Sequence, residues 1–481
     1  MLPSRVHIII SFLGLSVALY FACFHHIQRL PINLWDESLF FVRALHFLEQ
    51  GSYMPNFDLY DYGVDHRNTK LPFTTFSQVL GLKLFGINTL ALRVPVLIIF
   101  ITTAFYSIKF FQREFGQYGI GIITTLVLIS STGFLRDHML RTGDQDIPFA
   151  CYILLATFFF YRFELRRQSA DLWLFGFWVI AALLTKNLLI GLLLPGLILY
   201  CLIRGSFLAL AKDLRVYLLL FVMTVIYVGL VGYYESRFPG FFDRMWNYEL
   251  FGRYTNAVDG HDNNHFYFLE NMGLKDFFPF LLLMPVAVFV LLILDKYKRY
   301  RNFVILSAAV FLMYFLGISI SSTRLFWYSA PLYPLGAVII ALMFFPEVDT
   351  ENHLLLRRLP FVGFLLLLLP YSIAMQSINN PKTEYQSSKL GSFLENLERD
   401  RPELRKFSFF DNSFGTGAGF YIEQAKRKGI DIDFKRLPNF GIGEYVSLCR
   451  HKMVPHIDEK YTKEKIYDDP DCVIYRITTM R

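Results

Sequence analysis

Two acidic residues follow closely on the first long apolar stretch of the chain. Trp35-Asp36-Glu37 comes a few residues after an apolar run that ends near residue 27. A carboxylate in this place, close to a bilayer surface, can take a proton from an acceptor hydroxyl. The alternative is that Asp36 only caps the helix that begins here. The polar and apolar residues that follow fall on opposite sides at helical spacing, which predicts an amphipathic helix lying at the membrane interface.

Two more charged residues adjoin apolar segments. Lys70 precedes a second apolar segment that ends at Gly86, and its ammonium either extends to lipid headgroups or provides a point charge for a phosphate. Asp146 lies at the boundary of a later span, where a carboxylate without a partner is costly. Arg136 and Arg141 are available to pair with it, so a structural ion pair and a catalytic role both stay open.

A later polar loop holds two histidines on either side of an acidic residue. His261 and His265 flank Asp262 and are candidate ligands for a divalent metal, although no second ligand motif accompanies them. The plain alternative is that these histidines are solvated loop residues. The sequence therefore requires no cofactor and leaves a divalent metal open.

Two basic residues stand at the edges of other apolar stretches. Lys186 interrupts a long apolar run, and Arg324 stands beside Trp327 and Tyr328. Ordinary placement at the membrane interface explains Lys186, and an anchoring aromatic belt explains the Arg324 segment. A role in catalysis is the alternative for both.

The cysteines divide into two groups. Cys23, Cys151 and Cys201 lie in or near apolar stretches, where a thiol is simply buried. Cys449 and Cys472 both lie in the polar carboxyl-terminal segment. If that segment is in an oxidising compartment, a disulfide between these two residues is expected.

The composition is that of a membrane protein. Of 481 residues, 54% are hydrophobic and only 18% are charged, below the roughly 25% of soluble domains. The net charge of +7 arises largely from short loops between apolar stretches, so membrane topology explains it better than nucleic-acid binding does. The apolar run Ile8–Phe24 is too long for a signal peptide and predicts a retained first span.

Apolar runs long enough to cross about 30 Å of hydrocarbon predict eleven spans. The stretch 172–203 is divided into two of them, because a single helix of that length is too long and Lys186-Asn187 interrupts it. The predicted spans are 8–27, 88–111, 118–135, 146–163, the two arms of 172–203, 216–234, 277–294, 303–320, 326–345 and 359–375.

The positive-inside rule favours this count. With a cytoplasmic amino terminus and eleven spans, the Lys- and Arg-rich loops lie on the cytoplasmic side, including the most basic one at 295–302. Three long polar segments then share the outer side: 28–87, 235–276 and the tail from about residue 376.

The tail alternates short strand patterns with a helical one. Strands are predicted at Phe407–Phe410, Ile430–Phe434 and Val473–Ile477, and a helix at Thr416–Lys428. We therefore expect an α-helical polytopic membrane module over residues 1–375 and a small extracytoplasmic α/β domain over 376–481.

The order of short motifs along the chain points to one family. The motifs are Asp36-Glu37, Lys70-x-Pro72 with Leu84-Phe85-Gly86 and Arg93-Val94-Pro95, Arg141-Thr142 with Asp146-x-Pro148, Thr185-Lys186, Gly252-Arg253-Tyr254-Thr255 followed by Gly260-His261, and Leu325-Phe326-Trp327-Tyr328 with Tyr333-Pro334. In this order they resemble the polyprenyl-phosphate-sugar-dependent glycosyltransferases of the GT-C class. The resemblance is closest to the group containing protein O-mannosyltransferases and the lipid A aminoarabinose transferase, and it covers about residues 30–340.

The resemblance implies roles for particular residues. Asp36 resembles the aspartate that acts as catalytic base or orients the acceptor, with Glu37 as its companion. Lys70 matches the lysine near the donor phosphate, and Arg253 and His261 match residues that line the donor site. The remaining implied members of the site are Asp146, which lines the same cavity, and Arg324, which precedes the Tyr-Pro segment.

The implied activity is transfer of a sugar from a polyprenyl phosphate to a hydroxyl or phosphate of a lipid, a protein or a surface glycan. Inversion is expected if a single carboxylate participates. Thr69 and Leu71 depart from the aminoarabinose transferases, which tend to carry Glu and Pro there, and this argues against aminoarabinose and against a metal held by that Glu. The membrane is expected to be the inner (cell) membrane, with membrane lipids as further partners and no nucleic acid.

Two other classes of polytopic protein remain as alternatives. A transporter or flippase tends to show internal repeats and charges at mid-membrane, whereas the polar candidates here gather at the outer ends of spans. An O-antigen ligase type of enzyme uses a lipid-pyrophosphate donor, so donor preference separates it from the first hypothesis. The tail domain could instead bind a partner.

Overall fold

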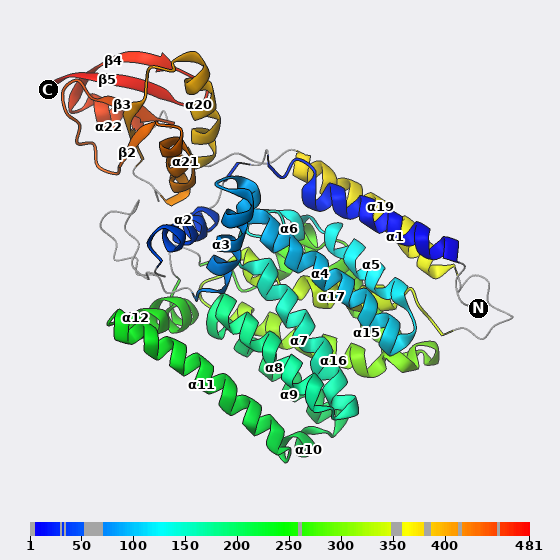
Figure 1. The fold of residues 1–481 in the computed structure, drawn as a ribbon. Coiled ribbons are helices and arrows are strands. Elements are labelled where there is room, and N and C mark those ends of the chain that lie inside the picture. The colour runs from blue at the N-terminus through cyan, green and yellow to red at the C-terminus, as the bar shows by residue number, and fades with distance from the viewer. Residues whose placement is uncertain are drawn as a thin grey trace.

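The computed structural model describes residues 5–28, 31–32, 35–51, 71–257, 262–347, 358–379, 386–411, 416–449 and 453–481. Two predicted site residues, Lys70 and His261, lie outside these ranges. Within them the chain forms a large helical module followed by a smaller α/β domain at the carboxyl end (Figure 1).

The helical module consists of long helices joined by short connections (Figure 1). Its α-helices are α1 (Arg5–Leu19), α2 (Trp35–Gln50), α3 (Phe73–Phe85), α4 (Thr89–Phe115), α5 (Tyr118–Ile129), α6 (Thr132–Leu135), α7 (Asp146–Arg166), α8 (Ser169–Lys186), α9 (Leu193–Arg204), α10 (Phe207–Ala211), α11 (Leu214–Arg237), α12 (Phe241–Arg244), α13 (Phe251–Thr255), α14 (Tyr267–Asn271), α15 (Phe280–Ile293), α16 (Arg301–Ile320), α17 (Leu332–Leu342) and α19 (Leu359–Asn379). Short π or 3₁₀ turns complete it: η1 (Tyr20–Phe24), η2 (Asn187–Leu192), η3 (Met245–Leu250), η5 (Met272–Asp276), η6 (Asp295–Tyr300) and η7 (Phe326–Ser329). Helices prevail because apolar stretches in lipid must satisfy their backbone hydrogen bonds internally.

Among the described residues, six helices are long and apolar enough to cross a membrane, or seven if one bent pair counts as a span. The bent pair joins Tyr267–Asp276 to Phe280–Ile293 at an angle of 98°. Three shorter apolar helices accompany them, Ile8–Phe24, Tyr118–Ile129 and Leu332–Leu342. The polytopic helical architecture is therefore confirmed, while the count of eleven is reached only if the bent pair, the three shorter helices and both arms of Ser169–Arg204 are all included.

The stretch Ser169–Arg204 reverses direction in its middle. Lys186, at the end of α8, forms an ion pair with Asp146 at the start of α7. Tyr200, in α9, donates a hydrogen bond to Glu164 near the other end of α7 (3.1 Å), although Asp146 and Glu164 are about 27 Å apart along the helix. One straight helix cannot make both contacts, so α8 and α9 are the two arms that the sequence predicts.

Glycines allow the long helices to approach closely. A Cβ atom on Gly121 would lie 2.5 Å from Cα of Ile108, so α4 and α5 meet almost backbone to backbone here. Gly196 makes the same kind of approach to Val310 on α16, again with 2.5 Å between the added Cβ and Cα. Small residues serve this purpose in membrane helices because van der Waals contact replaces the hydrophobic driving force.

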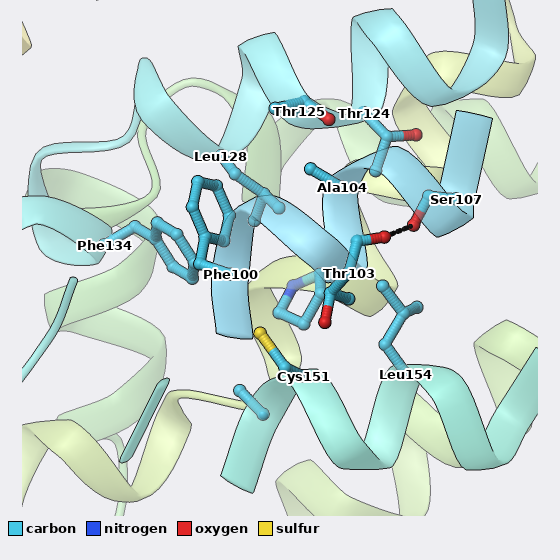
Figure 2. A pocket seen from close by; sticks show the side chains of 12 residues that line it. Phe100, Thr103, Ala104, Ser107, Thr124, Thr125, Leu128, Phe134, Cys151 and Leu154 are labelled. Atoms are coloured by element: carbon cyan, nitrogen blue, oxygen red, sulfur yellow. Dashed lines mark hydrogen bonds between the residues drawn. The ribbon is translucent and has the colours of Figure 1, made fainter. Parts of the chain in front are cut away.

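A closed cavity of about 10 Å³ lies between α4, α5 and α7 (Figure 2), which is roughly the space of one water molecule. Four hydroxyl side chains face it, and each donates to the carbonyl four residues earlier in its own helix: Thr103, Ser107, Thr124 and Thr125. The rest of its wall is mostly apolar. The four hydroxyls that face the cavity are therefore already engaged as hydrogen-bond donors.

The tail forms a mixed five-stranded sheet in the order β2-β1-β3-β5-β4. Its elements are α20 (Gln386–Asp400), β1 (Lys406–Phe410), α21 (Thr416–Arg427), β2 (Asp431–Lys435), β3 (Tyr445–Leu448), α22 (Val454–Asp458), β4 (Tyr461–Asp468) and β5 (Val473–Met480). β1 runs parallel to β2 and β3, while β5 runs antiparallel to β3 and β4. The predicted strands and helix correspond to β1, β2, β5 and α21. The structure contains the predicted disulfide, with 3.9 Å between the Cα atoms of Cys449 and Cys472.

Helix α2 exists as predicted, and the rest of the protein covers much of its surface. Its apolar residues Phe41 and Leu45 are buried, and so are the polar residues Glu37 and Arg43. Helix α21 of the tail packs on one side of α2, where the rings of Phe41 and Phe420 meet edge to face at 4.9 Å. The tail domain and α2 lie toward the same end of the long helices (Figure 1).

We expect Gly121→Ala to destabilise the helical module. Because the new methyl group would meet the backbone of Ile108, α4 and α5 must separate, and overpacking of this kind costs about 1–3 kcal/mol. Thermal unfolding of the purified protein in detergent measures the effect. Gly229→Ala, on α11, is the matched control because nothing lies within 4 Å of its added Cβ. Equal melting temperatures for the two variants would contradict the close approach.

Candidate active site

Three side chains from two segments meet at one end of the long helices. Nδ1 of His138 lies 2.5 Å from Oδ2 of Asp144 and 3.8 Å from Oδ2 of Asp36. Asp36 comes from the first turn of α2, and the other two come from the loop between α6 and α7. One ligand atom from each side chain falls within 4.8 Å of the others, so these three residues, here called the Asp-His cluster, can hold a metal ion.

The backbone of His138 supports a functional role. Its φ of 61° lies in the left-handed region, which a residue with a side chain seldom adopts unless its surroundings hold it there. The imidazole stacks on the ring of Trp327, with 3.8 Å between the ring centres. The ring is thus held between an aromatic face and the Asp144 carboxylate.

In the Asp-His cluster, the charged forms of His138 and Asp144 stabilise each other. Burial opposes protonation of His138, but its hydrogen bond with Asp144 and the nearby charges of Asp144 and Asp36 raise its pKa. Burial also opposes the ionised form of Asp144, yet His138 and the backbone N–H of Gln145 lower the pKa of that carboxyl. An imidazolium beside a carboxylate is the state that these shifts favour.

Asp146 is paired, but with a residue that the sequence did not indicate. Its carboxylate is buried and forms an ion pair with Lys186, whose side chain is 10% exposed. Arg136 pairs instead with Asp276 (3.0 Å), and Arg141 donates to the carbonyls of Ala22 and His25, near the end of the first span. Asp146 thus has the ion pair that the sequence left open, but its partner is neither of the two arginines, because the α7–α8 hairpin brings Lys186 to this position.

Two cations border the ring of Tyr328. Nζ of Lys186 lies 5.2 Å from the ring centre, and a guanidinium N–H of Arg253 donates to the Tyr328 hydroxyl at 2.6 Å. Tyr328 and Trp327, on η7, thus line the site, in contrast to the interpretation as an aromatic belt alone. Lys186 and Arg253 are suitably placed charges for an anionic group near the Asp-His cluster.

The Arg324 side chain mainly stabilises the neighbouring loop through hydrogen bonds. Its guanidinium donates to the carbonyl oxygens of Asn263 and Ser319, and it lies 2.7 Å from Nδ1 of His265. His265 therefore faces an arginine, and within the described ranges it belongs to no group of potential metal ligands. Its predicted metal partner, His261, falls outside those ranges.

Glu37 is completely buried and engaged on both oxygens. It accepts from Nε of Arg93 at 2.7 Å and from a second guanidinium nitrogen at 3.0 Å, and Oε1 also accepts from the backbone N–H of Gly143 at 2.9 Å. Gly143 directly precedes Asp144. The geometry therefore favours a positioning function for Glu37, which holds the loop of the Asp-His cluster against α2.

Sequence reasoning did not select several of these residues. His138 was missed because it stands in no ligand motif, and Lys186 and Tyr328 were attributed to the membrane interface. The available signal was the pair Asp144 and Asp146, which are two residues apart at the mouth of a span.

The comparisons with known proteins agree with this description. Residues 69–231 match the family model described as dolichyl-phosphate-mannose-protein mannosyltransferase. An uncharacterized protein of Aquifex aeolicus (strain VF5) is 24% identical over 177 residues. That match spans 37% of this chain and 34% of the relative, so only about a third of the relative's length is represented.

Two solved proteins share the fold. ArnT from Cupriavidus metallidurans, bound to undecaprenyl phosphate, is 15% identical with a TM-score of 0.74, and the alignment covers 98% of each chain. The archaeal oligosaccharyltransferase AglB from Archaeoglobus fulgidus, with an inhibitory peptide and a dolichol-phosphate, is 11% identical with a TM-score of 0.55, over 98% of this chain and 74% of that one. The Archaeoglobus fulgidus oligosaccharyltransferase in complex with Zn and sulfate aligns at 13% identity and a TM-score of 0.50, over 96% and 72%.

The resemblance inferred from the motif order is therefore confirmed. The chain is a multi-pass integral membrane protein that shares the fold of ArnT over 98% of its length and matches the family model of dolichyl-phosphate-mannose-protein mannosyltransferases over residues 69–231.

Proposed function

We propose that this protein transfers a sugar from a polyprenyl-phosphate donor to a hydroxyl or phosphate of a lipid, protein or glycan acceptor. The observation that carries the proposal is the position of Asp36 beside His138 and Asp144, with Lys186 and Arg253 close by at Tyr328. The lipid phosphates bound by ArnT and AglB support the donor class. The distribution of basic loops supports an extracytoplasmic site with a cytoplasmic amino terminus in the cell membrane.

The proposed reaction is a single displacement. The acceptor oxygen attacks C1 of the sugar while Asp36 takes its proton. The bond between C1 and the phosphate oxygen breaks, and its electron pair leaves with the lipid phosphate. Lys186 and Arg253 stabilise the phosphate that departs, and Lys70 and Arg324 remain predicted contributors. Because one carboxylate acts on one face, the anomeric configuration inverts.

The Asp-His cluster fits a divalent metal chemically. Two carboxylates and one imidazole are ordinary ligands of such ions, and their ligand atoms already lie within 4.8 Å of one another. Binding would displace the extra proton of the His138 imidazolium, because only a neutral imidazole is a ligand. A bound cation would supply positive charge beside the leaving phosphate. Its ligands would be Asp36, His138 and Asp144, and the Zn complex of the archaeal oligosaccharyltransferase supports this class of site.

We expect Asp36→Asn to lower transfer from a polyprenyl-phosphate sugar by about a thousandfold, since general-base catalysis contributes about 10²–10⁴. The measurement is turnover of a radiolabelled lipid-phosphate sugar by the purified variants at equal protein concentrations. Asp243→Asn is the control, because Asp243 is an exposed aspartate of α12. Full turnover in Asp36→Asn would overturn the base assignment. A preference for lipid-pyrophosphate donors, or lipid flipping without transfer, would overturn the proposed function.

We expect His138→Gln to weaken binding of a divalent metal by at least about tenfold, because it removes one of three ligands. Titration of chelator-treated protein with Mn²⁺ or Zn²⁺, followed by calorimetry, measures the affinity. His456→Gln replaces an exposed histidine of the tail domain and should leave the affinity unchanged. Equal affinities in wild type and His138→Gln would exclude the cluster as a metal site.

A further inference from the structure

Helix α21 of the tail domain contacts the segment that leads into α2 and its first turns. The hydroxyl of Tyr421 accepts a hydrogen bond from the backbone N–H of Ile32 at 2.7 Å, in a buried position. The backbone N–H of Phe420 donates to Oγ of Ser38 at 3.1 Å, also buried. Since Ser38 lies two residues after Asp36, these contacts reach the first turn of the helix that carries the proposed base.

The same segment is also held by the helical module. Arg93 donates to the carbonyls of Ile27 (2.8 Å) and Pro31 (3.1 Å) and forms the buried pair with Glu37. The entry to α2 is thus held by both the Tyr421 hydroxyl and the Arg93 guanidinium. Glu37 in turn accepts a hydrogen bond from the backbone N–H of Gly143, next to the Asp-His cluster.

The tail domain contains a space shaped for the Tyr421 ring. A Cβ atom on Gly391 of α20 would lie only 2.4 Å from Cε1 of Tyr421, so a side chain there would push the ring aside. Burial raises the pKa of Tyr421 to about 12, and the hydroxyl therefore stays neutral at ordinary pH. The ring is held by α20, and its polar end is held by the backbone of Ile32.

We propose that Phe420 and Tyr421 are positioning residues, through which the tail domain holds the first turn of α2 so that Asp36 faces His138. The kinetic consequence rests on the proposed transferase function, whereas the position of α2 does not. Removal of the Tyr421 hydroxyl leaves a buried N–H without its acceptor, which such groups rarely tolerate. The entry segment then shifts to regain a partner, and the Asp36 carboxylate shifts with it.

The test compares wild type with Tyr421→Phe and Gly391→Ala in the full-length protein. Tyr421→Phe removes one oxygen, and Gly391→Ala displaces the same ring without changing any polar group. Arg427→Gln is the control, because it breaks the exposed ion pair between Arg427 and Glu49 at the other end of the α2–α21 contact (2.8 Å). Hydrogen–deuterium exchange of residues 36–46 reads the order of α2, and steady-state kinetics read kcat and KM separately.

We expect both variants to exchange faster over residues 36–46, with unchanged exchange in α7 and in the tail sheet. A displacement of about 1 Å of a catalytic group costs up to about a hundredfold, so kcat should fall about tenfold or more while the donor KM stays within about twofold. Arg427→Gln should match wild type in both measurements.

Three results would overturn the proposal: unchanged exchange of residues 36–46 in both variants, equal acceleration across the tail sheet and α7, or faster exchange with an unaltered kcat. If wild-type protein transfers no sugar from any lipid phosphate, the proposed function fails instead, and the exchange comparison still decides whether Tyr421 positions α2.

Discussion

The ion pair between Glu37 and Arg93 is the contact on which the arrangement of the site depends. Each side chain is only 1% exposed, so neither charge can turn to water. Arg93 also holds the carbonyls of Ile27 and Pro31, and Glu37 accepts from the backbone of Gly143. Removing one partner of such a pair costs about 3–5 kcal/mol, because the other charge remains buried and uncompensated. The end of the first span, α2, α4 and the loop before α7 are therefore fixed by a single pair.

The same principle explains why the charged side chains of the proposed site are paired at one end of the long helices. At the edge of a bilayer a charge is retained only with a partner, and each charged group of the site has one: Asp146 with Lys186, Asp144 with His138, and Arg253 with Tyr328. Low-dielectric surroundings strengthen these interactions. They also leave the groups in fixed positions, which is what a site for an anionic lipid donor requires.

The parts of this site that the sequence revealed are those with a local signature. Asp36 follows a span directly, and Asp146 opens another, so hydropathy alone marks their positions. His138 carries no such mark, because its role arises from a left-handed backbone, the face of Trp327 and a carboxylate six residues later. In the tail, β4 was missed because it is an exposed edge strand rich in charge, and β3 because it has only four residues.

Hydropathy, charge in the loops and motif order were enough to determine the polytopic helical architecture, the reversal near Lys186, the α/β tail with its disulfide and the GT-C resemblance. Each of these depends on residues close together in the sequence, or on whether a segment lies in lipid or in water. Only the tertiary structure decided which cation neutralises Asp146 and what covers α2. Those outcomes depend on the α7–α8 hairpin and on α21, which begins more than 360 residues after α2 ends. Packing between segments so far apart leaves no pattern in the local sequence.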